Sequence, residues 1–190
     1  GKNGNDTLAI FSSSSNFEIV TLAGLTKIYG LDSTGLGYVY WTDTIKLQNV
    51  GTIMFADQTV KVETSSIGGN YMHWGSTSGT TINGTDGTDV IDSGGGSDTI
   101  NGGTGDDTLL LFADKADFEI VNLAGLTKIY GLESNGLELA YWADTIQMQN
   151  VETIIFADDT ITVDTSFSPD KEWHYWGSTS GEIYDTGDAD

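Results

Sequence analysis

The chain contains two copies of one sequence module. Residues 4–63 align without a gap to residues 105–164 at a constant offset of 101, and 37 of the 60 aligned positions are identical. The run LAGLTKIYGL occurs twice unchanged, and the match resumes after a one-residue insertion at WGSTSG, residues 74–79 and 176–181. A duplication of this length predicts two copies of one structural unit, so an expectation for one copy applies to the other.

Each copy has the pattern of β-strands. Apolar and polar residues alternate with period two in FEIV and in DTIQMQNVETIIFADDTITV, which favours strands over helices. Clusters of Asn, Asp and Gly separate these runs, and FADQTV and FADDTI predict hairpin turns. The chain has 25 glycines and one proline, Pro169. We therefore predict an all-β protein with almost no helix, in which each copy is a small antiparallel module of about 70 residues.

The charge excludes several classes of partner. The 28 acidic residues outnumber 7 basic ones, all of them lysine, which gives a net charge of −21. Such a surface repels phosphate backbones and anionic lipids, so we expect neither nucleic-acid binding nor membrane docking or insertion. No apolar run approaches the roughly 18 residues of a membrane span. The absence of cysteine excludes disulfides and thiolate metal sites.

Three glycine- and aspartate-rich units lie between the copies. Residues 84–110 read GTDGTDVID, SGGGSDTIN and GGTGDDTLL, three nine-residue units in one register. The sixth position is always aspartate, the fourth always glycine and the eighth always apolar. Glycine lets backbone carbonyls turn toward a common centre, and aspartate adds charged oxygen, so the pattern predicts turns that hold a cation. The alternative is a solvated glycine linker, but a linker has no need of a nine-residue register.

These units resemble the nonapeptide G-G-x-G-x-D-x-U-x of the RTX, or haemolysin-type, calcium-binding proteins. The resemblance implies a short parallel β-roll in which six residues form a turn, three form a strand and the apolar eighth residue points inside. It also implies that calcium lies between turns stacked on the same side, so that Asp89 and Asp107 share an ion. The first unit departs at Thr85 and Asp86 and the second at Ser93, which reduces the expected number of ions to one or two.

The resemblance names Ca²⁺ as the cofactor. The ligands it implies are contributed by the turn glycines and aspartates and by the degenerate N-terminal echo GKNGNDTLA: Gly84, Asp86, Gly87, Asp89, Gly94, Gly96, Asp98, Gly103, Gly105, Asp106, Asp107 and Asp6. We expect four regions: a first β module at 1–78 with a partial calcium turn at 1–9, the RTX-like roll at 79–110, a second module at 111–180, and the start of a further turn region at 181–190. The chain begins and ends inside motif-like sequence, which suggests a fragment of a larger protein.

Calcium is expected to control folding, because the compact acidic chain repels itself until cations neutralise its turns. Calcium at a hundredfold above its dissociation constant adds about 2.7 kcal/mol per site, out of a typical stability of roughly 5–15 kcal/mol. The resemblance implies a secreted or cell-surface protein, exported unfolded by type I secretion and folded outside the cell. The segment after the third unit also resembles those that separate or end RTX arrays in large secreted adhesins and polysaccharide-acting exoproteins of Gram-negative bacteria.

Duplicated aromatic residues are candidates for polysaccharide binding. They could form a platform on which sugar rings stack beside a carboxylate, or they could pack in the core. The candidates are Tyr40, Trp41, Asp43, Tyr141, Trp142, Asp144, Trp74 and Trp176. Lys27 and Lys128, in the unchanged run, could meet an acidic sugar, although a solvated strand face is the alternative.

Catalysis is not expected. His73 and His174 do not occupy repeated positions, so neither a zinc site nor a Ser-His-Asp triad was duplicated with the module. No pair of acids is singled out for glycoside cleavage. The first hypothesis is a calcium-dependent, non-catalytic extracellular module for adhesion or polysaccharide binding. The alternative is a structural spacer and secretion-folding segment of a larger exoenzyme, and a third hypothesis is an enzyme acting on an acidic polysaccharide.

Overall fold

The described part of the chain is built from β-strands. The computed structural model describes residues 6–31, 44–64, 68–76, 78–132 and 145–166, with only the backbone at 70–76. These residues form sixteen strands and two single-turn 3-10 helices, and no α-helix. The predictions of an all-β fold with almost no helix are confirmed for this part of the chain. No helix within it has the length and apolar character needed to cross a membrane.

The first repeat forms two three-stranded sheets. One has the order β1-β5-β6 and the other the order β2-β3-β4. The strands are β1 (Asp6–Ala9), β2 (Phe17–Leu22), β3 (Leu25–Gly30), β4 (Ile45–Gln48), β5 (Val50–Met54) and β6 (Thr59–Lys61), with the 3-10 turn η1 (Ser14–Asn16) before β2.

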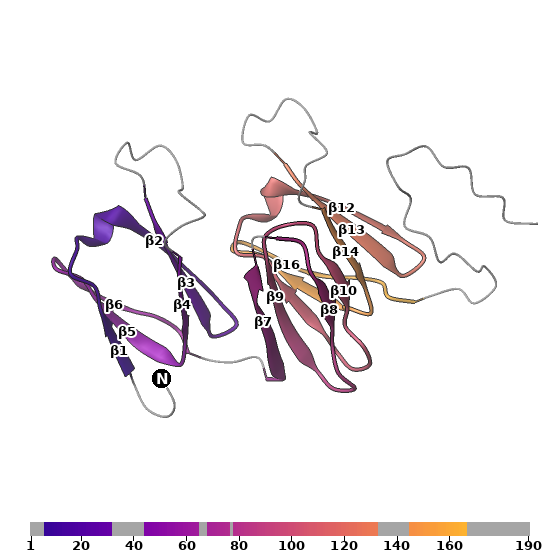
Figure 1. Ribbon diagram of the computed structural model, residues 1–190, viewed down its shortest axis with the longest axis horizontal. Coiled ribbons are helices and arrows are strands. Elements are labelled where there is room, and N and C mark those ends of the chain that lie inside the picture. The colour runs from indigo at the N-terminus through magenta and orange to yellow at the C-terminus, as the bar shows by residue number, and fades with distance from the viewer. Residues whose placement is uncertain (1–5, 32–43, 65–67, 77, 133–144, 167–190) are drawn as a thin grey trace, which may run out of the picture.

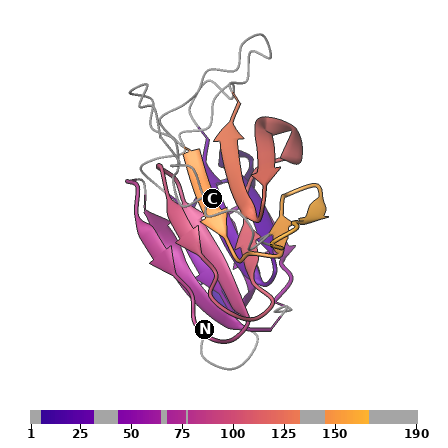
Figure 2. The same ribbon diagram turned by 90° about the vertical axis from the view of Figure 1, so that its right-hand side faces the viewer.

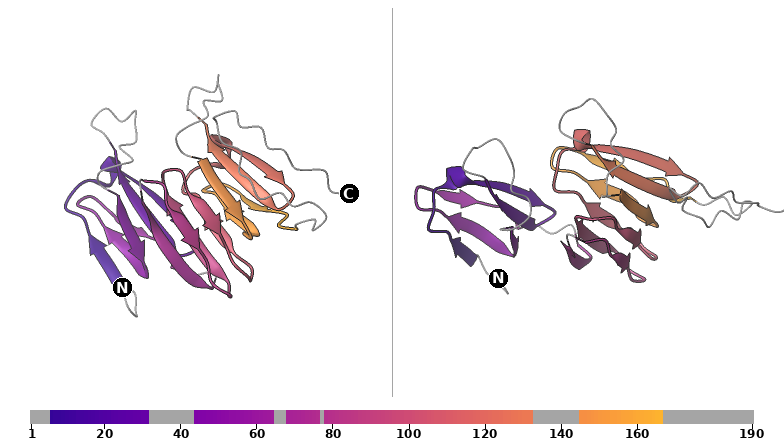
Figure 3. Two further views of the ribbon diagram at one scale, coloured as in Figure 1. Left: turned by 45° about the vertical axis from the view of Figure 1, so that its right-hand side comes forward. Right: turned by 45° about the horizontal axis from the view of Figure 1, so that its top comes forward.

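The second repeat and the central units together form two five-stranded sheets. Their orders are β12-β13-β14-β10-β8 and β16-β15-β11-β9-β7. The central strands are β7 (Asn70–Ser76), β8 (Thr81–Asn83), β9 (Asp89–Gly94), β10 (Thr99–Asn101) and β11 (Thr108–Leu110). The remaining elements are η2 (Lys115–Asp117), β12 (Phe118–Leu123), β13 (Leu126–Gly131), β14 (Thr145–Gln149), β15 (Thr153–Ile155) and β16 (Thr160–Thr162). In Figure 1 the central strands lie with the second repeat, whose sheets they extend, and the left view of Figure 3 shows them between the two repeats.

Three of the four sheets among the described residues are mixed and only the β2-β3-β4 sheet is antiparallel throughout, so the expectation of antiparallel modules holds only in part. Strand β1 pairs with β5 in parallel, and its counterpart β11 pairs with β15 in parallel. Both strands follow a glycine- and aspartate-rich stretch and meet their partner only after the chain has crossed through a three-stranded antiparallel hairpin unit. A connection of that length is what parallel pairing requires. The hairpins predicted at FADQTV and FADDTI are confirmed as β5–β6 and β15–β16.

The central strands follow one another at nine-residue intervals and alternate between the two five-stranded sheets. β8 and β10 pair in parallel with Ile82 opposite Ile100, and β9 and β11 pair in parallel with Ile91 opposite Leu109. Each partner is therefore 18 residues, or two units, away. All four side chains are buried in one cluster between the sheets, as expected for the apolar eighth position. The first and third units also lie side by side, as expected.

The two repeats build the same core twice. The core of the first repeat includes Ile28, Ile53 and Phe55, and adding 101 to every member of that cluster gives a member of the second cluster. The Phe17 and Phe55 rings lie 5.6 Å apart, and the Phe118 and Phe156 rings lie 5.7 Å apart. Ile82, Ile91 and Ile100 from the central strands complete the second core. The second repeat therefore buries more apolar surface than the first, with the free-energy gain that this burial brings.

Local chemistry explains the duplicated turns. The β2–β3 hairpin closes through Ala23 and Gly24, whose φ values of 50° and 82° are both positive. Positive φ at both central residues is typical of the type I′ turn that suits a two-residue hairpin. Its counterpart at Ala124 and Gly125 has φ values of 52° and 78°. The unchanged sequence LAGL is thus explained by this turn.

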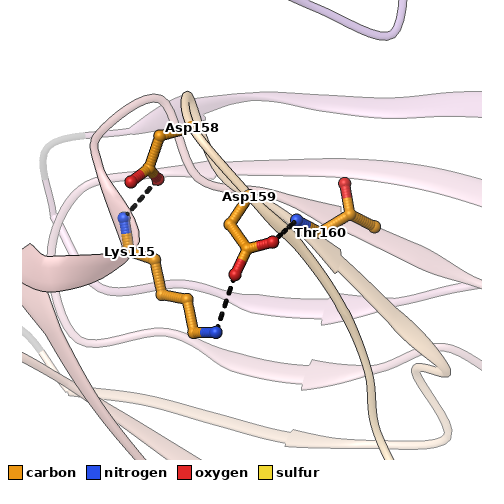
Figure 4. A network of polar contacts seen from close by, with 4 residues as sticks. All are labelled: Lys115, Asp158, Asp159 and Thr160. Carbon is orange, nitrogen blue, oxygen red and sulfur yellow. Dashed lines mark hydrogen bonds and ion pairs between the residues drawn. The ribbon is translucent and has the colours of Figure 1, made fainter.

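An aspartate fixes the short 3-10 turn of each repeat. The Ser14 N–H donates to Asp57 Oδ1 at 2.8 Å, and the Lys115 N–H donates to Asp158 Oδ1 at 2.7 Å. In the second repeat Lys115 Nζ also meets Asp159 Oδ2 at 2.7 Å, while the Thr160 N–H donates to Asp159 Oδ1 (Figure 4). Asp57 lies in the β5–β6 turn and Asp158 in the β15–β16 turn, so each holds the 3-10 turn of its repeat against that hairpin, a structural role.

The repeats pack against each other through an interface that we call the inter-repeat interface. One side is the β2–β3 face of the first repeat, with Leu22 and Leu25, and the other includes Val90 and Leu110. Lys27 lies inside it, 5% exposed, with Nζ 2.8 Å from Asp92 Oδ1 and 4.1 Å from the centre of the Phe112 ring. The expectation that Lys27 lies on a solvated strand face is therefore wrong, whereas Lys128 is half-buried. The end-on view in Figure 2 shows the first repeat behind the second.

Candidate metal centre

Glycines bring the turns of the first and third units into direct contact. A side chain at Gly84 would collide with the carbonyl oxygen of Gly102, and a side chain at Gly102 would collide with the carbonyl oxygen of Asn150. Residues 84–89, 102–107 and 150–152 therefore form three levels that lie one on another, and we call them the turn stack. Only glycine permits so close an approach of one backbone to the next.

A ladder of carboxylates links the three levels of the turn stack. The Asp89 N–H donates to Asp107 Oδ1 at 2.8 Å, and the Asp107 N–H donates to Glu152 Oε2 at 2.8 Å. Asp89 and Asp107 are 0% and 1% exposed. The Asp89 carboxylate in turn accepts hydrogen bonds from the Thr85 N–H at 2.6 Å and from Thr85 Oγ1. Three acidic side chains thus share one stack of backbone turns.

The turns beside β8 and β10 repeat this arrangement with Asp98. Asp98 is buried, and its Oδ1 accepts hydrogen bonds from the Thr80 N–H at 2.8 Å and from Thr80 Oγ1 at 2.9 Å. Gly96 has a φ of +90°, and a side chain there would collide with the backbone of Ser78 and Gly79. Asp98 and Asp107, both at the sixth position of their units, therefore each accept a hydrogen bond from the backbone N–H of the residue 18 positions earlier.

The Asp107 carboxylate is buried among other acids. Its Oδ2 is buried and has no hydrogen-bond partner among the described residues. Burial, together with the nearby acids Asp89, Glu152 and Asp106, raises the pKa of Asp107 to about 6, against the lowering effect of the hydrogen bond from the Asp89 N–H. At neutral pH the group is mostly ionised, so a buried negative charge needs a positive partner.

The turn stack fits a calcium ion in two respects. Asp107 Oδ2 is a buried carboxylate oxygen, and the contacts of Gly84 and Gly102 place backbone carbonyls beside the Asp89 and Asp107 carboxylates. Within the described ranges, no three His, Asp or Glu side chains gather closely enough to hold a metal ion by themselves. A cation here would therefore take most of its ligands from backbone carbonyls, which calcium accepts alongside carboxylates.

The implied ligands fall into distinct environments. Asp86 and Asp106 are exposed on the turns, whereas Asp89, Asp98 and Asp107 point into the structure and are buried. The glycines Gly94, Gly96, Gly103 and Gly105 all have positive φ, a conformation that other residues rarely adopt. Gly84 and Gly87 lie in the first turn. Asp6 is on β1, in the sheet of the first repeat, and so lies in a different sheet from the central units.

The aromatic candidates fall outside what the structure describes. Residues 40, 41, 43, 141, 142, 144 and 176, which carry the predicted platforms, lie outside the described residues. Trp74 is on β7, of which only the backbone is described, with its Cα opposite that of Asp92. The polysaccharide platform therefore stays a prediction.

The comparisons identify no family. No protein-family model matches the chain, and no curated protein matches its sequence. The resemblance to RTX proteins consequently depends on the nonapeptide register alone.

Sequence reasoning missed three residues of the turn stack. Glu152 and Asn150 come from the loop before β15, far along the chain from the nonapeptides, and Gly102 is the first residue of the third unit. One signal was available for Glu152, because its counterpart in the first repeat is Gly51. It is one of the 23 aligned positions at which the two repeats differ.

Proposed function

We propose that this chain is a calcium-binding, non-catalytic module of a secreted or cell-surface protein, and that calcium controls its folding. The observation that carries the proposal is the turn stack, in which Asp89, Asp107 and Glu152 lie on three successive levels and Asp107 Oδ2 is buried without a hydrogen-bond partner among the described residues. A fold that brings these carboxylates together needs a cation to offset their repulsion.

We further propose that the central strands form a short RTX-like parallel β-roll. Support comes from the alternation of β8, β9, β10 and β11 between two sheets, from their 18-residue parallel register, and from the burial of the eighth residue of each unit. Asp89 and Asp107 would then hold one ion, with backbone carbonyls of the turns at residues 84–87 and 102–105. Asp98 belongs to the opposite side of the coil and would serve a second ion.

Calorimetric titration with calcium chloride tests the proposal. Binding of one or two ions is expected, and Asp107→Asn should weaken the binding because it removes the charge from the central level of the stack. The matched control is Asp114→Asn, which changes the net charge equally at an exposed aspartate outside the turns and should leave the affinity nearly unchanged. Absence of calcium binding at neutral pH, or equal effects of the two variants, would contradict the proposal.

The metal-free chain should lose stability as the pH rises through 6. The folded-state pKa of Asp107 is about 6, above the ordinary value of 3.8, so the proton is held more tightly in the folded state. The stabilisation from protonated Asp107 is fully present below about pH 4 and is lost as the pH passes 6. Two pKa units correspond to about 3 kcal/mol. Urea unfolding at a series of pH values, without calcium, measures the loss.

Asp107→Asn provides the control for the pH prediction, because other carboxylates also titrate in this range. The variant should remove the part of the pH dependence that centres on 6 and should stabilise the metal-free chain above that pH. If the variant and the unmodified chain have parallel stability curves from pH 4 to 7, Asp107 does not carry the effect.

Of the two roles expected for such a module, one observation favours the structural spacer. Lys27, on the strand LTKIYG of the first repeat, was a candidate contact for acidic sugars. Its side chain is buried against Asp92 and Phe112 and is therefore not exposed to a sugar. Adhesion through polysaccharide binding remains the other role, and a glycan array probed with the calcium-loaded chain tests it. The spacer role predicts no calcium-dependent binding on that array.

A further inference from the structure

The described residues expose four large apolar side chains, and these have one property in common. Each is the counterpart, at the offset of 101, of a residue in the inter-repeat interface. Phe11 is 97% exposed and corresponds to Phe112, and Met54 is 48% exposed and corresponds to Ile155. Leu123 is 71% exposed and corresponds to the buried Leu22. The fourth, Val121, is 37% exposed and corresponds to Val20.

These residues form two faces that match the two sides of the inter-repeat interface. Val121, Leu123 and Lys128 lie on β12 and β13, where the first repeat has Val20, Leu22 and Lys27, the docking side. Ala9, Phe11 and Met54 are the counterparts of Leu110, Phe112 and Ile155, the receiving side. Within the described residues, the second repeat thus presents a docking face on which no other repeat lies, and the first repeat presents part of a receiving face on which no other repeat lies.

We propose that the β12–β13 face of Val121, Leu123, Leu126 and Lys128 docks on a further copy of this repeat that follows in the same polypeptide. The occupant is defined by the interface already present, because the sequence from Leu123 to Leu132 is identical to that from Leu22 to Leu31. The further copy would present the counterparts of Val90 and Leu110 to the apolar side chains of this face. The counterpart of Phe112 would lie beneath Lys128, and that of Asp92 would pair with it. This inference goes beyond calcium binding and is independent of it.

Charge favours a linked copy over a separate molecule. Each chain carries a net charge of −21, so two free molecules repel each other over the distances at which they must meet. A covalent connection replaces that encounter with a high effective concentration. Val90 and Asp92, which form part of the receiving face, lie in the first nonapeptide unit, before the second repeat. A complete receiving face therefore needs a repeat together with the nonapeptides that precede it in the chain.

A three-repeat chain tests the proposal. Residues 1–181 are joined directly to a second copy of residues 80–166, which keeps the natural junction because WGSTSG precedes it in both places. Hydrogen exchange is then compared between this chain and the original, both with calcium. The amides of residues 121–128 should exchange at least about tenfold more slowly in the longer chain, because burial and packing raise the free energy of local opening.

Substitutions give a second, independent measurement. Leu123→Ser should have little effect on the urea midpoint of the original chain, where the side chain is exposed, and should lower the midpoint clearly in the three-repeat chain. Phe11→Ser is the matched control, because Phe11 faces away from the added copy and should behave the same in both chains. Leu22→Ser, at the buried counterpart of Leu123, should lower the midpoint in both.

Two results would overturn the proposal. Unchanged exchange at residues 121–128, together with equal effects of Leu123→Ser in both chains, would assign the face to a partner of another kind. Sedimentation of the original chain tests whether a second, separate molecule occupies the face. A concentration-dependent dimer that Leu123→Ser dissociates would assign the face to a second, separate molecule.

Discussion

Removal of calcium is expected to destabilise the protein strongly. The turn stack places Asp89, Asp107 and Glu152 on adjacent levels, and the Asp107 carboxylate is buried with one oxygen lacking a hydrogen-bond partner among the described residues. Calcium at a hundredfold above its dissociation constant should contribute about 2.7 kcal/mol per site, against a total stability of roughly 5–15 kcal/mol. Two sites would therefore provide a large share of the stability.

Urea unfolding followed by circular dichroism, with calcium and with EDTA, measures this contribution. Magnesium is the control for simple charge screening, because it requires a small octahedral shell and retains its waters, whereas calcium accepts many carbonyl oxygens. Magnesium should therefore restore little of the loss. If the metal-free and calcium-loaded chains have the same urea midpoint, calcium has no structural role here and the proposed function fails.

Breaking the buried pair between Lys27 and Asp92 should give the second large effect. The Lys27 ammonium is 2.8 Å from Asp92 Oδ1, and both side chains are almost completely buried in the inter-repeat interface. Burial lowers the pKa of Lys27, and the attraction of Asp92 partly opposes that change. Lys27→Ala leaves the Asp92 charge buried without its partner, and loss of one member of a buried pair typically costs about 3–5 kcal/mol.

The duplicated sequence supplies the control for the buried pair. Lys128 occupies the same position in the second repeat but is only half-buried, so Lys128→Ala should change the free energy of unfolding by no more than about 1 kcal/mol. Urea unfolding with saturating calcium gives both values. A double replacement of Lys27 and Asp92 by Met and Leu should recover much of the loss, because well-packed apolar residues often replace a buried ion pair without cost. Equal costs for Lys27→Ala and Lys128→Ala would show that the pair contributes little.

Much of the fold could be predicted from period and repetition. The alternation of apolar residues gave the strands, and the nine-residue register placed Ile91, Ile100 and Leu109 inside, because both patterns are local. The parallel pairing of β1 with β5 and of β11 with β15 could not be predicted in this way. It depends on which strands meet after a long connection, and nothing in the alternation of a strand encodes the direction of its neighbour.

The candidate site shows the same division. The resemblance of the nonapeptides to RTX units implied that Asp89 and Asp107 are neighbours. It could not point to Glu152, which reaches the stack only through the fold, 45 residues after Asp107. Lys27 was misjudged for a related reason. Lys27 and Lys128 have identical neighbours in the sequence, and their different burial is decided by whether another repeat lies on top of them.

Glu152 also sets a length. A stack of identical turns can be extended indefinitely, because the backbone N–H of each level can donate a hydrogen bond to the aspartate of the next level. Glu152, in the loop before β15, takes that place next to Asp107, and the turn stack ends there. Because the parallel partners β9 and β11 are 18 residues apart, inserting two more nonapeptides should add one level to the turn stack and leave its end at Glu152 unchanged. The distance between neighbouring repeats can therefore change in whole steps without a change in either repeat.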